Sequence, residues 1–169
     1  MLDSYVKPYF TEDWPEARRV NHITKEMVCN APYIYELLPR LNQVLAQVKT
    51  IVGYNFTGFD GEFLNRYGAT FNDDVVVEDL SNIFAAIYGE FSPKHGDFKF
   101  KNLSTCADYF GYDWGEETAH NSLADCRATA FCYQKSLEEV YQTLYKENIH
   151  KRDCGFFDES YDEYGDYNG

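Results

Sequence analysis

A histidine and an aspartate, with four residues between them, stand in "AHNSLADCRAT", residues 119–129, where a long helix begins. Asn121 or Ser122 could cap that helix, and Asp125 could complement its dipole, as polar residues at helix starts commonly do. Alternatively, His120 could exchange a proton near neutral pH while Asp125 binds a metal ion. The spacing alone favours the capping interpretation, so a catalytic interpretation requires a second half of a site elsewhere in the chain.

The stretch "IVGYNFTGFDGEFL", residues 51–64, is the candidate for that second half. Asn55 ends a predicted buried strand, and Asp60 stands where the next helix begins. Loops at the carboxyl ends of parallel strands are where α/β sheets bind ligands. Taken alone, Asp60 is explained equally well as a helix cap, and Asn55 as a residue that ends a strand.

Three short stretches predict the strands that would position these residues. "DSYVKP" is typical of a short strand ended by Pro8, and "TIVGYN" of a buried strand. The β-branched run of "DVVVEDLS" predicts a further interior strand. Because helices are predicted between the strands, the order favours an α/β domain.

Apolar spacings of three and four predict an amphipathic helix over residues 33–48, with Pro39 inside it. Similar spacing predicts one long helix from Ser122 to about Ile149. Shorter helices are predicted over residues 23–32, 59–68, 82–91 and 102–112, and loops over residues 9–22 and 92–101.

Composition bounds the class of protein. With 169 residues, 44% of them hydrophobic, the chain suits one domain with a sizeable core. The five cysteines are odd in number and form no C-x-x-C pair, so we expect reduced, mostly buried thiols and neither a disulfide framework nor a zinc site. No apolar run approaches the roughly 18 residues of a membrane span, and no signal segment is visible. We therefore expect a soluble, cytoplasmic protein with no membrane partner.

The net charge of -13 argues against a broad basic surface for duplex DNA. Residues 153–169 contain six carboxylates and no Lys or Arg, so we expect an acidic, disordered tail after a folded domain of residues 1–152. In "DFKFK", Phe98 and Phe100 alternate with lysines in a manner that could hold a single strand, although an ordinary edge segment is the favoured interpretation.

Together, "YNFTGFDGEFL" and "HNSLADCRA" resemble the second and third motifs of the DEDDh 3′-to-5′ exonucleases. That family includes the proofreading epsilon subunit of bacterial replicative DNA polymerase and ribonuclease T. The flanking stretches "YVKP", "NHITKEMV" and "VVVEDLSNIF" fall in the family's order, and the resemblance covers residues 1–150. It implies a ribonuclease H-like α/β fold, in which helices flank a mixed sheet.

The resemblance also implies a role for each candidate residue. Asp60 would be the carboxylate of the second motif, Asp125 a metal ligand of the third, and His120 the base that deprotonates the attacking water. Asn55 would contact the substrate. Two Mg²⁺ or Mn²⁺ ions about 4 Å apart would activate that water and stabilise the leaving 3′ oxygen of a single strand. DNA and RNA both remain open as substrates, because sugar selectivity depends on contacts to the 2′ position.

Two departures from the family pattern shape the expectations. First, family members begin with a strand that bears D-x-E, whereas the only D-x-E in this sequence is Asp60-Gly61-Glu62. Second, three residues separate Asn55 from Phe59, where the family usually has two. We therefore expect an N-terminally truncated fold that lacks its first two strands and is weak or inactive alone. Its exposed strand around Ile51 would favour self-association.

Two other functions remain open. One is a catalytically dead exonuclease-fold module that binds a partner. The other is an acidic nucleic-acid mimic that blocks a DNA-binding protein, which the net charge of -13 permits.

Overall fold

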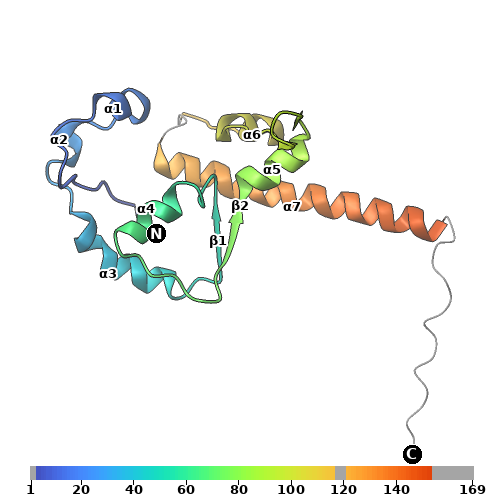
Figure 1. Ribbon diagram of the computed structural model, residues 1–169, viewed down its shortest axis with the longest axis horizontal. Helices are drawn as coiled ribbons and strands as arrows, with labels where there is room; N and C mark the ends of the chain where they lie inside the picture. Colours follow the sequence, from blue (N-terminus) through green and yellow to red (C-terminus); the bar gives the residue numbers. More distant parts are fainter. Residues whose placement is uncertain (1–2, 117–120, 154–169) are drawn as a thin grey trace, which may run out of the picture.

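The computed structural model describes residues 3–116 and 121–153 (Figure 1). This part of the chain forms helices and strands in the order α1 (Pro15–Asn21), α2 (Lys25–Val28), α3 (Ile34–Leu45), β1 (Thr50–Gly53), α4 (Asp60–Arg66), β2 (Val76–Asp79), α5 (Leu80–Tyr88), β3 (Phe91–Ser92), β4 (Asp97–Phe98), α6 (Leu103–Phe110) and α7 (Ser122–Asp153). The prediction of an α/β fold in which helices flank the sheet strands is confirmed, and the described strands form one parallel and one antiparallel pair.

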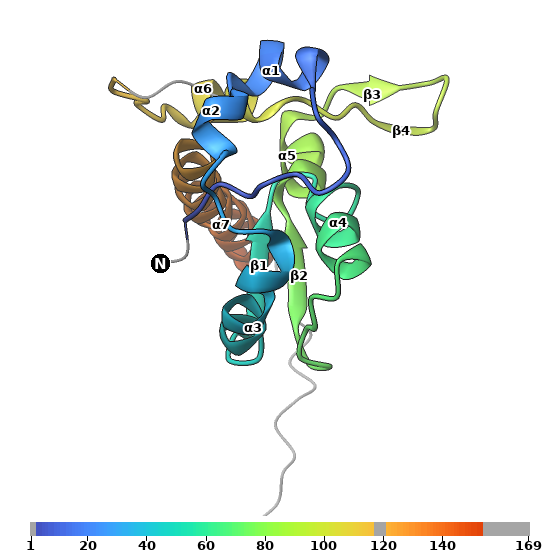
Figure 2. The ribbon, with the colours of Figure 1, turned by 90° about the vertical axis from the view of Figure 1, so that its left-hand side faces the viewer.

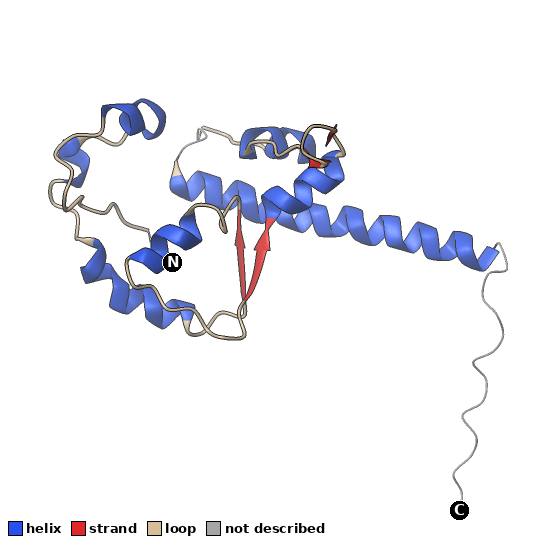
Figure 3. Ribbon diagram, viewed as in Figure 1, coloured by secondary structure: helices blue, strands red, loops and turns tan. Residues whose placement is uncertain are grey.

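The strands β1 and β2 form a parallel pair, in which Thr50 lies opposite Val76 and Gly53 lies opposite Asp79. Their arrows point the same way in Figure 3, so both carboxyl ends lie at one edge of the sheet. Helices α7 and α5 both contact β1, and they also contact each other. The sheet therefore places the loop after β1 and the start of α5 side by side.

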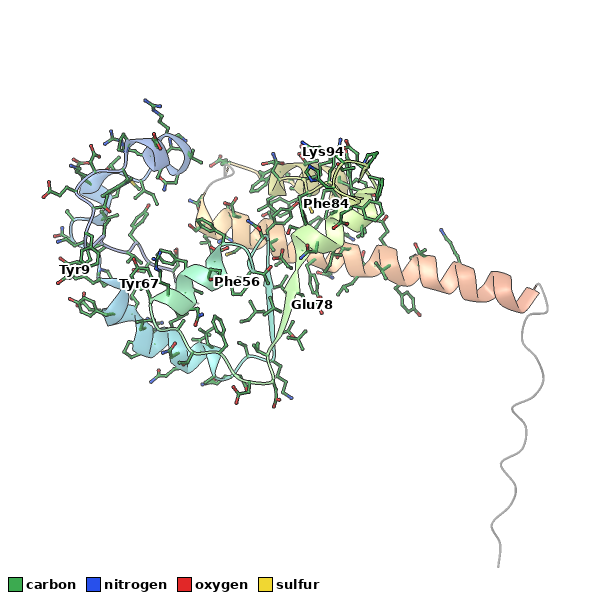
Figure 4. The ribbon with its side chains drawn as sticks, in the orientation of Figure 1. Tyr9, Phe56, Tyr67, Glu78, Phe84 and Lys94 are labelled. Carbon is green, nitrogen blue, oxygen red and sulfur yellow. The ribbon has the colours of Figure 1, made fainter. Side chains whose placement is uncertain are left out.

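The main core lies among α5, α6 and α7. Its fully buried residues are Leu80, Phe84, Cys106, Ala107 and Cys132. Figure 4 shows Phe84 among the side chains of α5 and α6. The four described cysteines are free thiols; Cys106 and Cys132 are buried, while Cys29 and Cys126 are exposed. The expectation of mostly buried thiols holds for half of the described cysteines.

The predicted helices are present, with shifted ends. Pro39 lies inside α3 without ending it, and α7 runs to Asp153 rather than stopping near Ile149. Helix α1 was not predicted, because its turn-forming residues favoured a loop over residues 9–22. Pro15 occupies the first position of α1, where a proline costs no hydrogen bond and its fixed φ suits a helix.

The predicted loop over residues 92–101 contains part of a hairpin instead. Strands β3 and β4 pair antiparallel, with Phe91 opposite Phe98, and the hairpin extends outward beside α5 (Figure 2). The two rings meet edge to face with centroids 6.0 Å apart. Strands of two residues are too short to leave an alternating pattern in the sequence, so tertiary and cross-strand contacts decide their conformation.

Two strand predictions are corrected. Residues 3–8 form no strand: the Lys7 N–H donates to the Pro32 carbonyl at 2.9 Å, and within the described residues no strand pairs with this segment. A strand exists through its partners, which a local pattern does not supply. Strand β2 pairs only with β1 among the described residues and leaves Val76 52% exposed, so it is an edge strand here rather than an interior one.

Within residues 3–116 and 121–153, no helix combines the length and apolarity needed to cross a membrane. Asp153 is the last described residue, so residues 154–169 of the predicted acidic tail lie outside the described part of the chain. The division of the chain into residues 1–152 and 153–169 stays a prediction.

Candidate active site

The loop after β1 is tightly folded. Asn55 adopts a left-handed backbone conformation with φ 57°, and the Gly61 N–H donates to the Phe56 carbonyl at 2.8 Å. A Cβ atom at Gly53 would lie 2.4 Å from the Phe56 Cβ, so only glycine allows the Phe56 side chain to fold back over the strand end. The three residues between Asn55 and Phe59 therefore fit into a tight turn.

Asp79, the last residue of β2, fixes that loop to the neighbouring strand. Its carboxylate accepts hydrogen bonds from the backbone N–H of Asn55 at 2.8 Å and from the N–H and Oγ1 of Thr57 at 3.1 and 2.7 Å. It also accepts from the N–H and Oγ of Ser81 at 3.2 and 2.8 Å, at the start of α5. One carboxylate therefore joins the loop, the strand and the helix.

The charge of Asp79 is stabilised although the residue is only 7% exposed. Burial alone would raise the pKa of this carboxyl, but the hydrogen bonds from Thr57, Ser81 and Asn55 outweigh burial and hold the pKa below its usual value. Asp79 is thus an anion held by donors in a largely buried position.

Asp60 is the first residue of α4 and follows the cap position, which Phe59 occupies. The alternative that Asp60 itself caps the helix is therefore wrong. Although the residue as a whole is exposed, nearby protein removes water from its carboxyl and raises the pKa, and the negative charge of Asp79 adds to that effect. The Asp60 carboxylate thus lies at the strand ends, within the electrostatic influence of Asp79.

Asp125 lies in the first turn of α7. Asn121 caps this helix, because its Oδ1 accepts from the N–H groups of Leu123 at 3.1 Å and Ala124 at 3.2 Å. The Asp125 N–H donates to the Asn121 carbonyl at 2.8 Å, which begins the helix. The capping interpretation is confirmed for Asn121, and the half-buried Asp125 lies in the first turn of the helix, where a carboxylate complements the helix dipole.

Asp60 and Asp125 act on a common neighbour, although they belong to different helices. Partial burial raises the pKa of the Cys126 thiol, and the negative charges of Asp125, Asp60 and Asp3 raise it further. The two candidate carboxylates are therefore both within electrostatic range of one sulfur atom. His120, the predicted base, lies outside the described residues.

A divalent metal ion can be tested against this donor set. Carboxylate oxygens are the ligands that Mg²⁺ and Mn²⁺ prefer, so Asp60 and Asp125 fit in chemical type. In the described part of the chain, however, no group of three or more His, Cys, Asp or Glu side chains is placed to hold a metal ion. The described donors are of the right kind, but on their own they are too few to complete a coordination shell.

Asp79 is a site residue that the sequence pattern did not predict. The available signal was an aspartate directly before Leu80-Ser81, at the junction of a strand and a helix, which is typical of a helix cap. Its hydrogen bonds with Asn55 and Thr57 depend on the parallel pairing of β1 and β2, so the local sequence pattern does not predict them.

A comparison with protein-family models finds a match to the RNase_T family, described as exonuclease, over residues 2–133. The matched segment contains Asn55, Asp60, His120 and Asp125. Searches of the curated proteins and of the solved structures find no match.

Proposed function

Since this chain belongs to the exonuclease family, we propose that it removes nucleotides from the 3′ end of single-stranded nucleic acid. The observation that supports this proposal is that Asp60 begins the helix that follows β1, while Asp125 lies in the first turn of α7, the helix that packs against β1. Such a region can receive a divalent cation and the phosphate that it binds.

Each candidate residue has a part in the proposed reaction. Asp60 and Asp125 hold Mg²⁺ or Mn²⁺, which, when bound, supplies an activated water and charge stabilisation for the leaving oxygen. His120 takes a proton from the attacking water and releases it to solvent, because an imidazole exchanges protons near neutral pH. Asn55 contacts the substrate, and Asp79 holds its loop in place.

The small number of described metal-binding side chains should lower the rate of hydrolysis. Mg²⁺ keeps its waters unless several anionic oxygens converge, so we propose that this chain alone is a slow catalyst. The same observation favours a second candidate function, a catalytically inactive module that binds nucleic acid without cutting it, because the described residues contain no three-ligand group.

We also propose that the chain self-associates through β1. Within the described residues β1 pairs with β2 alone, so its other edge presents unpaired backbone groups. Ile51 and Val52 are only half-buried there, and a second copy of the chain would cover them.

The hydrolysis proposal is tested with the full chain, Mn²⁺ and a short single strand labelled at its 5′ end. We expect a slow ladder of products shortened from the 3′ end, which chelation of the metal abolishes. His120→Ala should lower the rate by about 10² or more, because a positioned general base contributes that much.

The variants Asp60→Asn and Asp125→Asn should remove the same hydrolysis, while Asp108→Asn, which neutralises an exposed carboxylate of α6, should leave it unchanged. Products shortened from the 5′ end, or hydrolysis that survives in both site variants, would contradict the proposal. Tight binding of the strand without any hydrolysis would select the inactive module.

A further inference from the structure

A pocket of about 550 Å³ lies between the loop after β1 and the segment that leads into α6. Its walls come from three places: the loop residues around Asn55, the start of α5 at Asn82, and residues 100–103. Neither Asp60 nor Asp125 lines it. Its volume falls in the range of roughly 300–1,000 Å³ that small-ligand sites occupy.

Hydrogen bonds fix the walls of this pocket. The Tyr54 hydroxyl donates to the Lys101 carbonyl at 3.0 Å, which ties the loop to the segment before α6. Burial raises the pKa of Tyr54 well above its usual value, so this hydroxyl keeps its proton and remains a donor. On the opposite side, Asp79 holds Thr57 and Asn55. The pocket is therefore formed before any ligand arrives.

The charges around the pocket disfavour a phosphate. Among the described residues that line the pocket, Lys101 alone is basic. Its ammonium group pairs with Glu90 and lies 4.7 Å from the centre of the Tyr88 ring. Asp79 contributes a negative charge to the wall. A phosphate would meet a neutralised lysine and a carboxylate, so a neutral ligand fits better.

The remaining lining groups suit a flat heterocycle. The Phe100 ring is 61% exposed at the pocket and offers a face for stacking. Asn82 is exposed, and no hydrogen bond joins its amide to another described side chain. Asn102 uses its Oδ1 to accept from the N–H and Oγ1 of Thr105, both at 2.8 Å, which leaves its amide N–H groups as donors. An aromatic face beside amide groups is the combination that recognises unpaired bases.

We propose that this pocket binds one unpaired nucleobase of the strand whose 3′ end reaches Asp60 and Asp125. Phe100 stacks on the base and Asn82 hydrogen-bonds to its edge. The inference rests on the proposed action on single strands. Asn55 lies at one end of the loop after β1 and Asp60 follows its other end, so the base site and the candidate metal site share one loop.

The test uses the full chain in the presence of a chelator, so that no strand is cut, and measures the fluorescence anisotropy of labelled oligonucleotides. A single abasic site is moved along the strand, in one deoxyribose set and one ribose set. We expect one position at which removal of the base weakens binding about tenfold, the size expected for one lost stacked base. The set with the stronger effect identifies the sugar.

Phe100→Ala should weaken binding of the intact strand about tenfold and abolish the further loss at that position. Asn82→Ala, an exposed change on α5, should weaken binding a few-fold at the same position. Phe91→Ala is the matched control, because Phe91 is 53% exposed on the hairpin that precedes Phe100 but does not line the pocket. It should bind like the wild type, with unfolding temperatures recorded for every variant.

A profile without position dependence, a strand that does not bind, or a Phe100→Ala variant with the wild-type profile would overturn the base site. Hydrolysis that persists beside such a result would leave the proposed function standing. Conversely, a Phe100-dependent profile in a chain that never cuts would support the base site and refute the exonuclease proposal.

Discussion

At the residue scale, Asp79 decides the shape of the candidate site without belonging to the predicted set. Its five hydrogen bonds hold the loop that contains Asn55 and the start of α5. Asp60 adds a second carboxylate nearby, and each negative charge disfavours the other. The site therefore concentrates anionic oxygens at the ends of two parallel strands, where a cation would relieve their repulsion.

Asp79→Asn should destabilise the protein by about 3 kcal/mol at neutral pH, because an amide cannot accept all of these hydrogen bonds and the charge is lost. The pKa of Asp79 is lowered in the folded protein. Its stabilising effect is therefore fully present above the unfolded pKa of about 3.9 and is lost as the pH falls through the lower folded pKa. Denaturant unfolding at several pH values should show the wild type and the variant converging in acid. A difference that stays constant with pH would contradict this account.

How much of the site the sequence predicts differs from residue to residue. Asp60 and Asp125 stand within recognisable motif text, and each lies in the first turn of a helix. Asp79 stands in equally readable text, but its contacts form only when β1 and β2 pair. Local patterns thus identify residues with a chemical type and spacing, and miss those whose role comes from a neighbouring strand.

At the element scale, the start of α7 is held by one side chain. Asn121→Ala removes the acceptor for the N–H groups of Leu123 and Ala124 and should lower the free energy of unfolding by about 1 kcal/mol. Asn121→Ser keeps an acceptor at the cap and should restore most of that loss. Thermal or urea unfolding of both variants measures the effect; equal stability of the alanine variant and the wild type would show that Asn121 does not cap the helix in solution.

The elements themselves were predictable where their pattern was long. Helices α3 and α7 extend over several turns, and their apolar spacing anticipated them. The strand predicted over residues 3–8 is absent, and the β3–β4 hairpin was not predicted. Both errors have one cause, because strand formation depends on pairing with a second strand. Short β segments are therefore the part of this fold that a sequence pattern specifies least.

At the scale of the whole molecule, we expect self-association to be favoured over binding of a polyanion, because the chain is acidic and β1 pairs on one edge only in the part of the chain that the structure describes. The net charge of -13 opposes close contact with many phosphates, whereas pairing along β1 needs only backbone groups and half-buried apolar side chains. Sedimentation should show a fraction of dimer that increases with protein concentration. The fraction should also increase with salt concentration, because salt screens the repulsion between the acidic copies. A monomer under all of these conditions would contradict the role of β1.

The central claim is that Asp60 and Asp125 form one cation site, and calorimetric titration with Mn²⁺ tests it most directly. The full chain, Asp60→Asn, Asp125→Asn and the double variant are compared, with Asp108→Asn as the control for loss of one negative charge. We predict that each single site variant weakens Mn²⁺ binding as much as the double variant does, since one shared site is lost once, while the control binds like the wild type. Losses that add up as for two separate sites, or wild-type binding in the double variant, would contradict the account.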